Sequence, residues 1–205
     1  MCKIDWNLIM QIFSAIGSML VVIIAIWGDW IRTKLVPPKL RIIASNTKGE
    51  LTTFSPTGVR VIYYHFKVIN SRPWSIARNC RVLLKAVSKE LPNGEFQNQP
   101  LNTTPSFIWT PAEITPQAIN LVKEHAFDFG CVSEDFGFFR PVLNITPNNF
   151  QGHVGRNQKI RFSMQASADN FITEINQVFE VAWNGVWTDN LDNMMSNLTI
   201  REIKK

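Results

Sequence analysis

The sequence lacks the residue patterns that mark enzyme active sites. Its three histidines, His65, His125 and His153, are dispersed, with neither the H-E-x-x-H pattern of zinc proteases nor the G-x-S-x-G pattern of serine hydrolases. The glycine pair at residues 152–155 has neither the lysine nor the following helix that a phosphate-binding loop requires. We therefore expect a protein that is not an enzyme, with no catalytic residue, no bound metal and no cofactor.

Cysteine is also scarce, with only Cys2, Cys80 and Cys131 in the chain and no C-x-x-C spacing. An odd number without paired spacing argues against a disulfide framework or a zinc site. Cys80 and Cys131 each fall in an apolar stretch that alternates like a strand. We expect both to be buried free thiols in a reducing compartment.

One long apolar run, at residues 8–27, contains no ionisable side chain. A helix rises about 1.5 Å per residue, so a run of this length covers the roughly 30 Å of hydrocarbon in a bilayer. Trp6 precedes the run, and Trp27 and Trp30 stand at its far end, where indole rings favour the headgroup layer. The run predicts one transmembrane helix, within an anchor that covers residues 1–36.

A cleaved signal peptide is the alternative interpretation of this run. It would need a basic leader, an apolar core of about 7 to 15 residues and a cleavage site of the small-x-small type. The run is longer and its leader is nearly neutral. The nearest candidate cleavage site, at residues 25–27, has Trp27 where a small residue is required.

Positive charge flanks the run unequally. Lys3 and Asp5 cancel ahead of it, whereas four cations follow closely, namely Arg32, Lys34, Lys39 and Arg41. Because Lys and Arg near a span stay in the cytoplasm, the expected topology has the N-terminus outside, together with Cys2, and the C-terminal part in the cytosol. For a bacterial protein this means a single-pass protein of the inner membrane with a periplasmic N-terminus.

The charge asymmetry continues beyond the flank. Residues 28–89 contain twelve Lys or Arg against two acids, a net of +10, and residues 90–205 contain eight against thirteen, a net of −5. The half nearest the membrane is thus the basic half. Attraction to an anionic leaflet is the simplest use of this charge, and a nucleotide or nucleic-acid surface is the alternative.

After the anchor the pattern changes from helical to strand-like. Pro37 and Pro38 cannot continue a helix, so we expect it to stop near Val36 and a domain to follow over residues 39–205. Asn93-Gly94 and Asn184-Gly185 predict type I′ hairpins, the second between residues 182 and 187, while residues 100–120 predict an irregular crossover. Short strands separated by turns predict an antiparallel β-sandwich. The strand candidates are residues 40–44, 59–69, 80–87, 127–132, 140–145, 160–166, 174–183 and 198–203.

Two stretches carry a resemblance. Val68-Ile69-Asn70, followed after a loop by residues 77–82 (ARNCRV), resembles the strand-loop-strand pattern of bacterial immunoglobulin-like sandwich domains, and residues 168–170 with the strand into Trp183 are similar to such domains too. The layout of one N-terminal span, a proline hinge and a cytosolic sandwich resembles the small transmembrane effectors of bacterial antiphage systems, such as retrons and cyclic-nucleotide-triggered defences. This resemblance implies an immunoglobulin-like fold and a role in antiviral defence.

Two groups of side chains are candidates for binding. Arg72, Trp74, Arg78 and Arg81 combine guanidinium groups, which bind phosphates, with an indole that can stack on a base, so they form a possible ligand or partner loop. The alternative is structural, with Trp74 closing the end of the sandwich and the arginines solvated. The aromatic residues Phe136, Phe138 and Phe139 are expected in the core or at a partner contact.

Within the span, Gln11, Ser14 and Ser18 recur every three or four residues and Ala25 continues the same helix face. A face of small and polar residues favours association of helices in lipid, through close approach and interhelical hydrogen bonds. The alternative is a single tolerated glutamine near the interface. We expect a homo-oligomer formed through the span.

Together these features predict a membrane-anchored effector of a bacterial antiphage system. Its cytosolic sandwich would be triggered or released and would cause the spans to perturb the inner membrane. The expected partners are the lipid bilayer, further copies of the chain, and a protein or nucleoprotein at the sandwich, with a nucleotide ligand possible. The alternative is a membrane-tethered module that recruits a protein or nucleotide without membrane damage.

Overall fold

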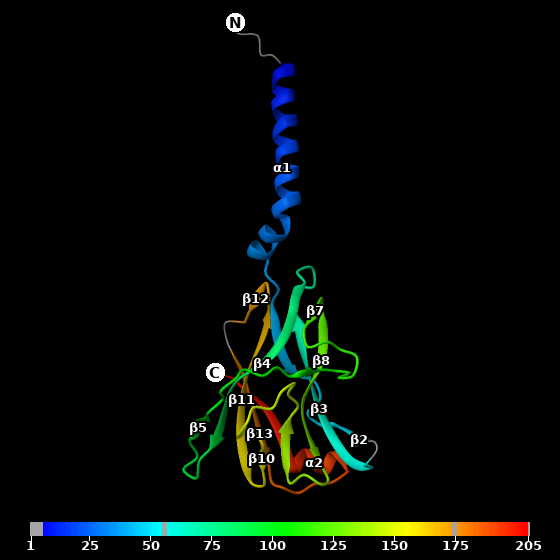
Figure 1. Ribbon diagram of the computed structural model, residues 1–205, viewed down its shortest axis with the longest axis vertical. Coiled ribbons are helices and arrows are strands. Elements are labelled where there is room, and N and C mark those ends of the chain that lie inside the picture. The colour runs from blue at the N-terminus through cyan, green and yellow to red at the C-terminus, as the bar shows by residue number, and fades with distance from the viewer. Residues whose placement is uncertain (1–5, 55–56, 174–175, 205) are drawn as a thin grey trace. The chain divides into compact units, whose positions relative to one another are not determined.

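The computed structural model of the chain describes residues 6–54, 57–173 and 176–204, and divides into two compact units, Met1–Pro37 and Pro38–Lys205. The first unit contains helix α1 (Trp6–Leu35), which ends two residues before Pro37 (Figure 1). Its segment Trp6–Gly28 is long and apolar enough to cross a membrane, and its large apolar side chains are exposed. The side chains of Arg32 and Lys34 lie outside the described part of the structure.

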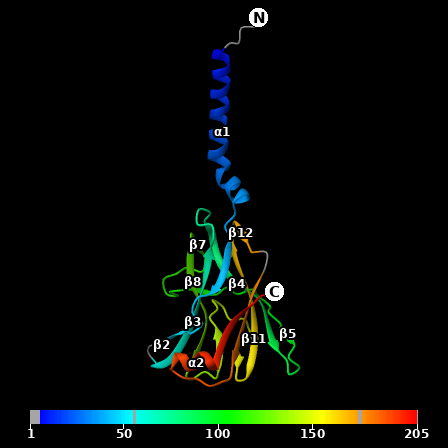
Figure 2. The same cartoon turned by 180° about the vertical axis from the view of Figure 1, so that it is seen from behind.

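The second unit is a sandwich of two antiparallel sheets, which confirms the predicted mainly β fold (Figures 1 and 2). In the first sheet the order is β1-β3-β8-β9-β10, with β2 also paired to β3 and β6 to β8; in the second it is β14-β13-β11-β4-β5, with β12 on β11 and β7 on β4. The first sheet comprises β1 (Leu40–Ala44), β2 (Glu50–Phe54), β3 (Val59–Asn70), β6 (Ile108–Trp109), β8 (Glu124–Ser133), β9 (Phe138–Pro141) and β10 (Val154–Gly155). The second comprises β4 (Ala77–Glu90), β5 (Phe96–Gln99), β7 (Ile119–Leu121), β11 (Gln158–Ala168), β12 (Phe171–Ile172), β13 (Gln177–Trp183) and β14 (Leu198–Ile203). Helix α2 (Leu191–Asn197) precedes β14.

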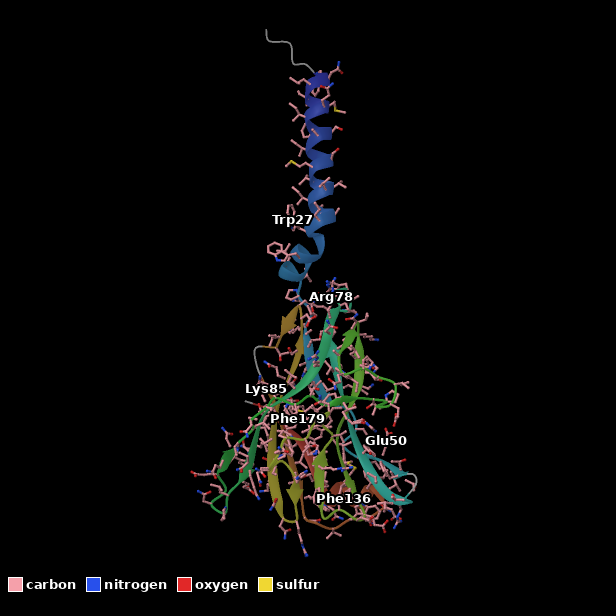
Figure 3. The ribbon with its side chains drawn as sticks, in the orientation of Figure 1. Trp27, Glu50, Arg78, Lys85, Phe136 and Phe179 are labelled. Atoms are coloured by element: carbon pink, nitrogen blue, oxygen red, sulfur yellow. The ribbon has the colours of Figure 1, made fainter. Side chains whose placement is uncertain are left out.

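Aromatic rings from both sheets meet in the core. Phe66 of β3 stacks on Phe129 of β8 with ring centroids 4.2 Å apart, and it contacts Phe179 of β13 across the sandwich at 4.8 Å. Figure 3 shows Phe179 in the middle of the sandwich. Large rings bury much apolar area for few rotatable bonds, so this cluster holds the two sheets together.

The long strand β3 has the alternation that its sequence predicts. The side chains of Ile62, Tyr64, Phe66 and Val68 are buried, while Tyr63, His65 and Lys67 face outward and are partly exposed. The predicted strands at residues 40–44 and 198–203 coincide with β1 and β14. The strands predicted at residues 59–69, 80–87, 127–132 and 160–166 correspond to β3, β4, β8 and β11, each of which is longer than predicted. Of the strand predicted at residues 174–183, the first two residues lie outside the described residues, and β13 begins at Gln177.

Two predictions about the second half of the chain are wrong. Asn184-Gly185 forms no hairpin, because Trp183 pairs with Leu198 and α2 lies between their strands; the Asn184 side chain instead accepts a hydrogen bond from the Val186 amide at 2.8 Å. Of the predicted strand at residues 140–145, only Arg140 and Pro141 belong to β9, because the chain then turns to Phe107, with which Leu143 makes an isolated bridge.

Several smaller elements were not predicted, namely β2, β5, β10, β12 and α2, and the predicted crossover contains β6 and most of β7. The turn at Asn93-Gly94 does join β4 to β5. A type I′ turn needs a positive φ at both central residues, whereas of this pair only Gly94 has one, at 83°, so the turn is not type I′. Its Gly94 amide donates to the Leu91 carbonyl at 2.9 Å.

The predicted aromatic group divides between core and surface. Phe139 is buried, Phe138 packs against the core, and Phe136 is exposed.

The buried amide of Asn70 joins three segments where the chain enters the sandwich. Its Oδ1 accepts hydrogen bonds from the Lys39 amide at 3.2 Å and the Arg72 amide at 3.0 Å. Its Nδ2 donates to the carbonyls of Ser75 at 2.7 Å and Val122 at 3.1 Å. We call this part of the sandwich the linker end; it comprises residues 38–39, the β3–β4 turn at residues 71–76, the β7–β8 turn at residues 122–123, and β12 with its preceding turn at residues 169–170.

We predict that Asn70→Ala lowers the free energy of unfolding by about 3 kcal/mol, because buried backbone groups on three segments lose their partners. Urea unfolding of the full chain in detergent micelles, followed by tryptophan fluorescence, measures the change. The control is Asn98→Ala on the exposed face of β5, which should change it by less than about 0.5 kcal/mol. A loss below about 1 kcal/mol for Asn70→Ala would mean that water replaces the amide.

Candidate functional site

The predicted ligand loop lies at the linker end. Arg72 and Trp74 belong to the β3–β4 turn, and Arg78 and Arg81 are exposed on the first part of β4. Figure 3 shows Arg78 at this end of the sandwich, with Glu50 farther along it. Trp74 is exposed and does not close the sandwich, so the structural alternative for this residue is wrong.

A second candidate site lies on the outer face of the first sheet, in an open groove of about 760 Å³ between β2, β3 and residues 110–113. At its floor the Nδ1 atom of His65 lies 2.7 Å from Oδ1 of Asp128 on the neighbouring strand β8. The Thr110 hydroxyl donates to the same carboxylate oxygen. The other ring nitrogen of His65 lies 3.6 Å from a carboxylate oxygen of Glu50 on β2.

Carboxylates dominate the electrostatics of this groove. Glu50, Glu113 and Asp128 line it, with His65 as their counterpart. The hydrogen bond to Asp128 raises the pKa of the His65 imidazole above its usual value, against an opposing effect of burial. Burial raises the pKa of the Tyr63 phenol, which also lines the groove and whose ring stacks on His65. The groove therefore offers an acidic surface suited to a cationic or hydrogen-bond-donating ligand.

The chemistry of this arrangement differs from that of a hydrolytic triad. In a triad the histidine lies between the carboxylate and the nucleophile, whereas here Asp128 lies between His65 and the hydroxyl of Thr110. The outward nitrogen of His65 faces a carboxylate oxygen of Glu50 and no hydroxyl or thiol nucleophile. The groove thus combines hydrogen-bonding groups with a histidine whose charge depends on pH. Among the described residues, no three His, Cys, Asp or Glu side chains are grouped closely enough to hold a metal ion.

Sequence reasoning missed the groove because its members lie far apart in the chain. His65 and Asp128 are 63 positions apart and meet only through the pairing of β3 with β8. One signal was present, since Asp128 stands between Phe127 and Phe129 in an otherwise apolar strand. Alternation places such a residue on the face opposite to that of Phe127 and Phe129.

The predicted face of the span belongs to a longer pattern. Gln11, Ser14, Ser18 and Ala25 are joined by Asn7 ahead of them and by Gly28 after them, with spacings of four, three, four, seven and three residues. This is the seven-residue repeat of a coiled-coil seam, in which Val21 occupies the remaining position. The Ser18 hydroxyl donates to the Ser14 carbonyl at 2.9 Å within the helix, so the Gln11 amide is the stronger donor toward a neighbouring helix.

The two cysteines of the sandwich are buried and free, as predicted. Burial raises the pKa of the Cys80 thiol to about 12. It also raises the pKa of the Cys131 thiol, against an opposing hydrogen bond from Nε of Arg140 at 3.3 Å. Both thiols are therefore protonated and unreactive at neutral pH.

These features define a class of protein: a β-sandwich domain attached to an N-terminal helix that is long and apolar enough to span a membrane. The chain matches no protein-family model and no curated protein. Its function must therefore be inferred from its own residues.

We predict that His65→Gln reduces the pH dependence of stability. Because the folded state raises the pKa of His65, protonation stabilises the fold fully below the unfolded value of about 6.5, and this contribution is lost as the pH rises through the folded pKa. The free energy of unfolding of the wild type should thus fall more between pH 5.5 and pH 8.5 than that of the variant. At pH 5.5 the free energy of unfolding of His65→Gln should be about 2 kcal/mol lower than that of the wild type, which is typical of the loss of a hydrogen bond to a charged group.

The measurement is urea unfolding of both proteins at each pH. His153, whose pKa burial lowers, contributes with the opposite sign, but it is present in both proteins and cancels in their difference. Lys67→Gln on the same face of β3 is the control and should leave the pH profile unchanged. Parallel profiles for wild type and His65→Gln would contradict the prediction.

Proposed function

We propose that this protein is a single-span membrane protein whose sandwich recognises a partner and whose helix anchors it in the bilayer. One observation carries the proposal: the segment Trp6–Gly28 exposes an almost wholly apolar surface, while the sandwich has a buried core of its own. Such a helix needs lipid around it, because exposing its side chains to water is unfavourable by about 25 cal/mol per Å².

The groove around His65 is the proposed recognition surface. Its three carboxylates favour a basic partner, such as a protein segment with exposed Lys or Arg, over a nucleotide with its negative phosphates. Strand β2 borders this groove and all five of its residues are exposed. An extended basic segment could lie along it, contacting Glu50 and Glu113.

A more specific function is that of an effector that perturbs the inner membrane in antiphage defence. The observation that favours it is the heptad of small and polar residues along α1, from Asn7 to Gly28. Such a seam supports close packing of parallel helices in lipid, where each hydrogen bond between helices contributes about 0.5 to 2 kcal/mol. In this version, a signal at the sandwich brings the spans together.

The topology of the proposal has the N-terminus in the periplasm and the sandwich in the cytosol. We predict that a reporter fused after Lys205 is active only if it is of the type that requires the cytosol. Neutral residues in place of Arg32, Lys34, Lys39 and Arg41 should give a mixture of orientations, since these cations follow the span. Activity of a reporter that requires the periplasm, in the unsubstituted protein, would overturn this topology.

We predict that replacing Gln11, Ser14 and Ser18 together by Leu abolishes association of the spans. Leucine keeps the helix apolar enough to insert but removes the polar members of the seam. The variant should fractionate with membranes, yet lose crosslinked oligomers and, on overexpression, any growth arrest and membrane depolarisation. The matched control replaces Ile9, Ile16 and Ile23 by Leu, on the opposite face of the same helix, and should behave as the parent.

The outcomes separate the two versions of the function. Arrest with depolarisation by the parent and its loss in the seam variant support the effector. A parent that neither arrests growth nor depolarises the membrane supports a tethered recognition module alone. A parent chain that is found in the soluble fraction would contradict both.

A further inference from the structure

The linker end of the sandwich exposes large apolar side chains from three separate segments. Trp74 and Ile76 in and beside the β3–β4 turn are 58% and 45% exposed, Val122 in the β7–β8 turn is 49% exposed, and Ile172 on β12 is 60% exposed. Figures 1 and 2 both show β7 and β12 at this end of the sandwich. Side chains of this kind are unfavourable in water, so their grouping indicates a surface that is covered in use.

Cations flank these apolar side chains. Lys39 and Lys123 are exposed, and their carbonyl groups accept hydrogen bonds from the amides of Ser71 and Asn70 respectively, which places both residues beside the β3–β4 turn. Arg81 of β4 is exposed and pairs with Ser167, which in turn pairs with Ile172. Arg72 and Arg78 add further positive charge to the same end.

Two acidic side chains in the described part of this end have partners within the sandwich. Asp169 accepts a hydrogen bond from the side-chain amide of Asn79. Glu124 pairs with Lys67 at 3.1 Å. Among the described residues of this end, the cations Lys39, Arg81 and Lys123 outnumber the carboxylate of Asp169, so their net charge is positive.

The surface is held in shape by two asparagine side chains. Asn70 fixes the β3–β4 and β7–β8 turns as described above. Asn170 joins β12 to β4, since its Oδ1 accepts from the Arg78 amide at 3.0 Å and its Nδ2 donates to the Ile76 carbonyl at 2.8 Å. A surface that is already ordered loses little conformational entropy when it binds.

The chain connection keeps this end close to the bilayer. Helix α1 continues for seven residues past Gly28, about 10 Å at the helical rise, and Lys39 follows the helix end at Leu35 by four residues, at most about 14 Å of extended chain. Lys39 is itself part of the linker end. A short tether gives its two ends a high effective concentration for each other, so even a weak surface affinity is sufficient for docking.

We propose that the linker end docks on the anionic lipid leaflet from which the anchor helix emerges, with Trp74, Ile76, Val122 and Ile172 among the headgroups and Lys and Arg on the lipid phosphates. This inference rests on the proposed membrane anchor. Exposed apolar side chains flanked by cations bind interfacial lipid, because the free energy of apolar burial adds to that of attraction to anionic headgroups. A phosphate-bearing soluble ligand would use the cations but leave the four apolar side chains in water.

The test uses the full-length protein with Cys2→Ser, reconstituted in nanodiscs of phosphatidylcholine alone or mixed with phosphatidylglycerol. Cys80 and Cys131 are buried, so a cysteine introduced by Ile172→Cys is labelled selectively with a fluorophore whose emission spin-labelled lipids quench. The matched position is Val186→Cys, which is 50% exposed and follows Trp183, paired with Gln158 at the opposite end of β11. Size-exclusion chromatography checks that each protein enters the nanodisc.

In anionic nanodiscs we expect the probe at position 172 to be quenched about twofold more than the probe at position 186, and this difference to fall in about 1 M salt, where charges are screened beyond about 3 Å. Replacing Lys39, Arg81 and Lys123 by Gln should reduce the quenching at position 172. Replacing Lys48, Lys85 and Arg156 by Gln, exposed cations outside the linker end, should not.

Each outcome decides a separate point. Equal quenching at the two positions in proteins that enter the nanodiscs overturns the docking surface and leaves the anchor intact. Quenching at position 172 that is independent of anionic lipid and salt overturns the role of the cations. A protein that does not enter nanodiscs contradicts the anchor itself, and this proposal with it.

Discussion

The side-chain amide of Asn70 is the interaction on which the arrangement of the sandwich's linker end depends. An amide has two donors and an acceptor oxygen, so one buried residue can satisfy backbone groups of Lys39, Arg72, Ser75 and Val122 together. No apolar residue could fill this position without leaving those groups unpaired, which is costly in a buried site. The point at which the chain enters the domain and two of its turns are thereby fixed relative to each other.

The sandwich carries two surfaces of opposite charge. The linker end carries Lys39, Arg81 and Lys123 beside apolar tips, while the groove on the outer face of the first sheet is lined by Glu50, Glu113 and Asp128. A bilayer with anionic lipid attracts the first surface and repels the second. The proposed docking would therefore leave the groove open to a basic partner. His65 makes the charge of that groove depend on pH near neutrality.

The predictions that succeeded rest on local chemistry. The twenty-residue run without an ionisable side chain, Pro37 and Pro38, and the alternation of β3 each determine structure through their immediate neighbours. The same holds for the apolar stretches around Cys80 and Cys131. The failures arose where a local signal had several outcomes. The chain does bend at Gly185, which has a φ of 87°, but the partner of β13 is β14 beyond α2. The pairing of strands within the sheet therefore decided that the segment after β13 leads through α2 to β14.

By itself the sequence determined the apolar helix, the proline break, the alternation of β3 and the mainly β character of the domain, because each follows from side-chain type and period along the chain. It also placed Arg72, Trp74 and Arg78 in one stretch. Only the tertiary structure joined His65 to Asp128, Asn70 to Lys39, and the segment before β12 to Ile76 beside the β3–β4 turn. These residues meet through strand pairing and turn contacts between distant segments, and such register depends on the packing of the whole core, which no local pattern encodes.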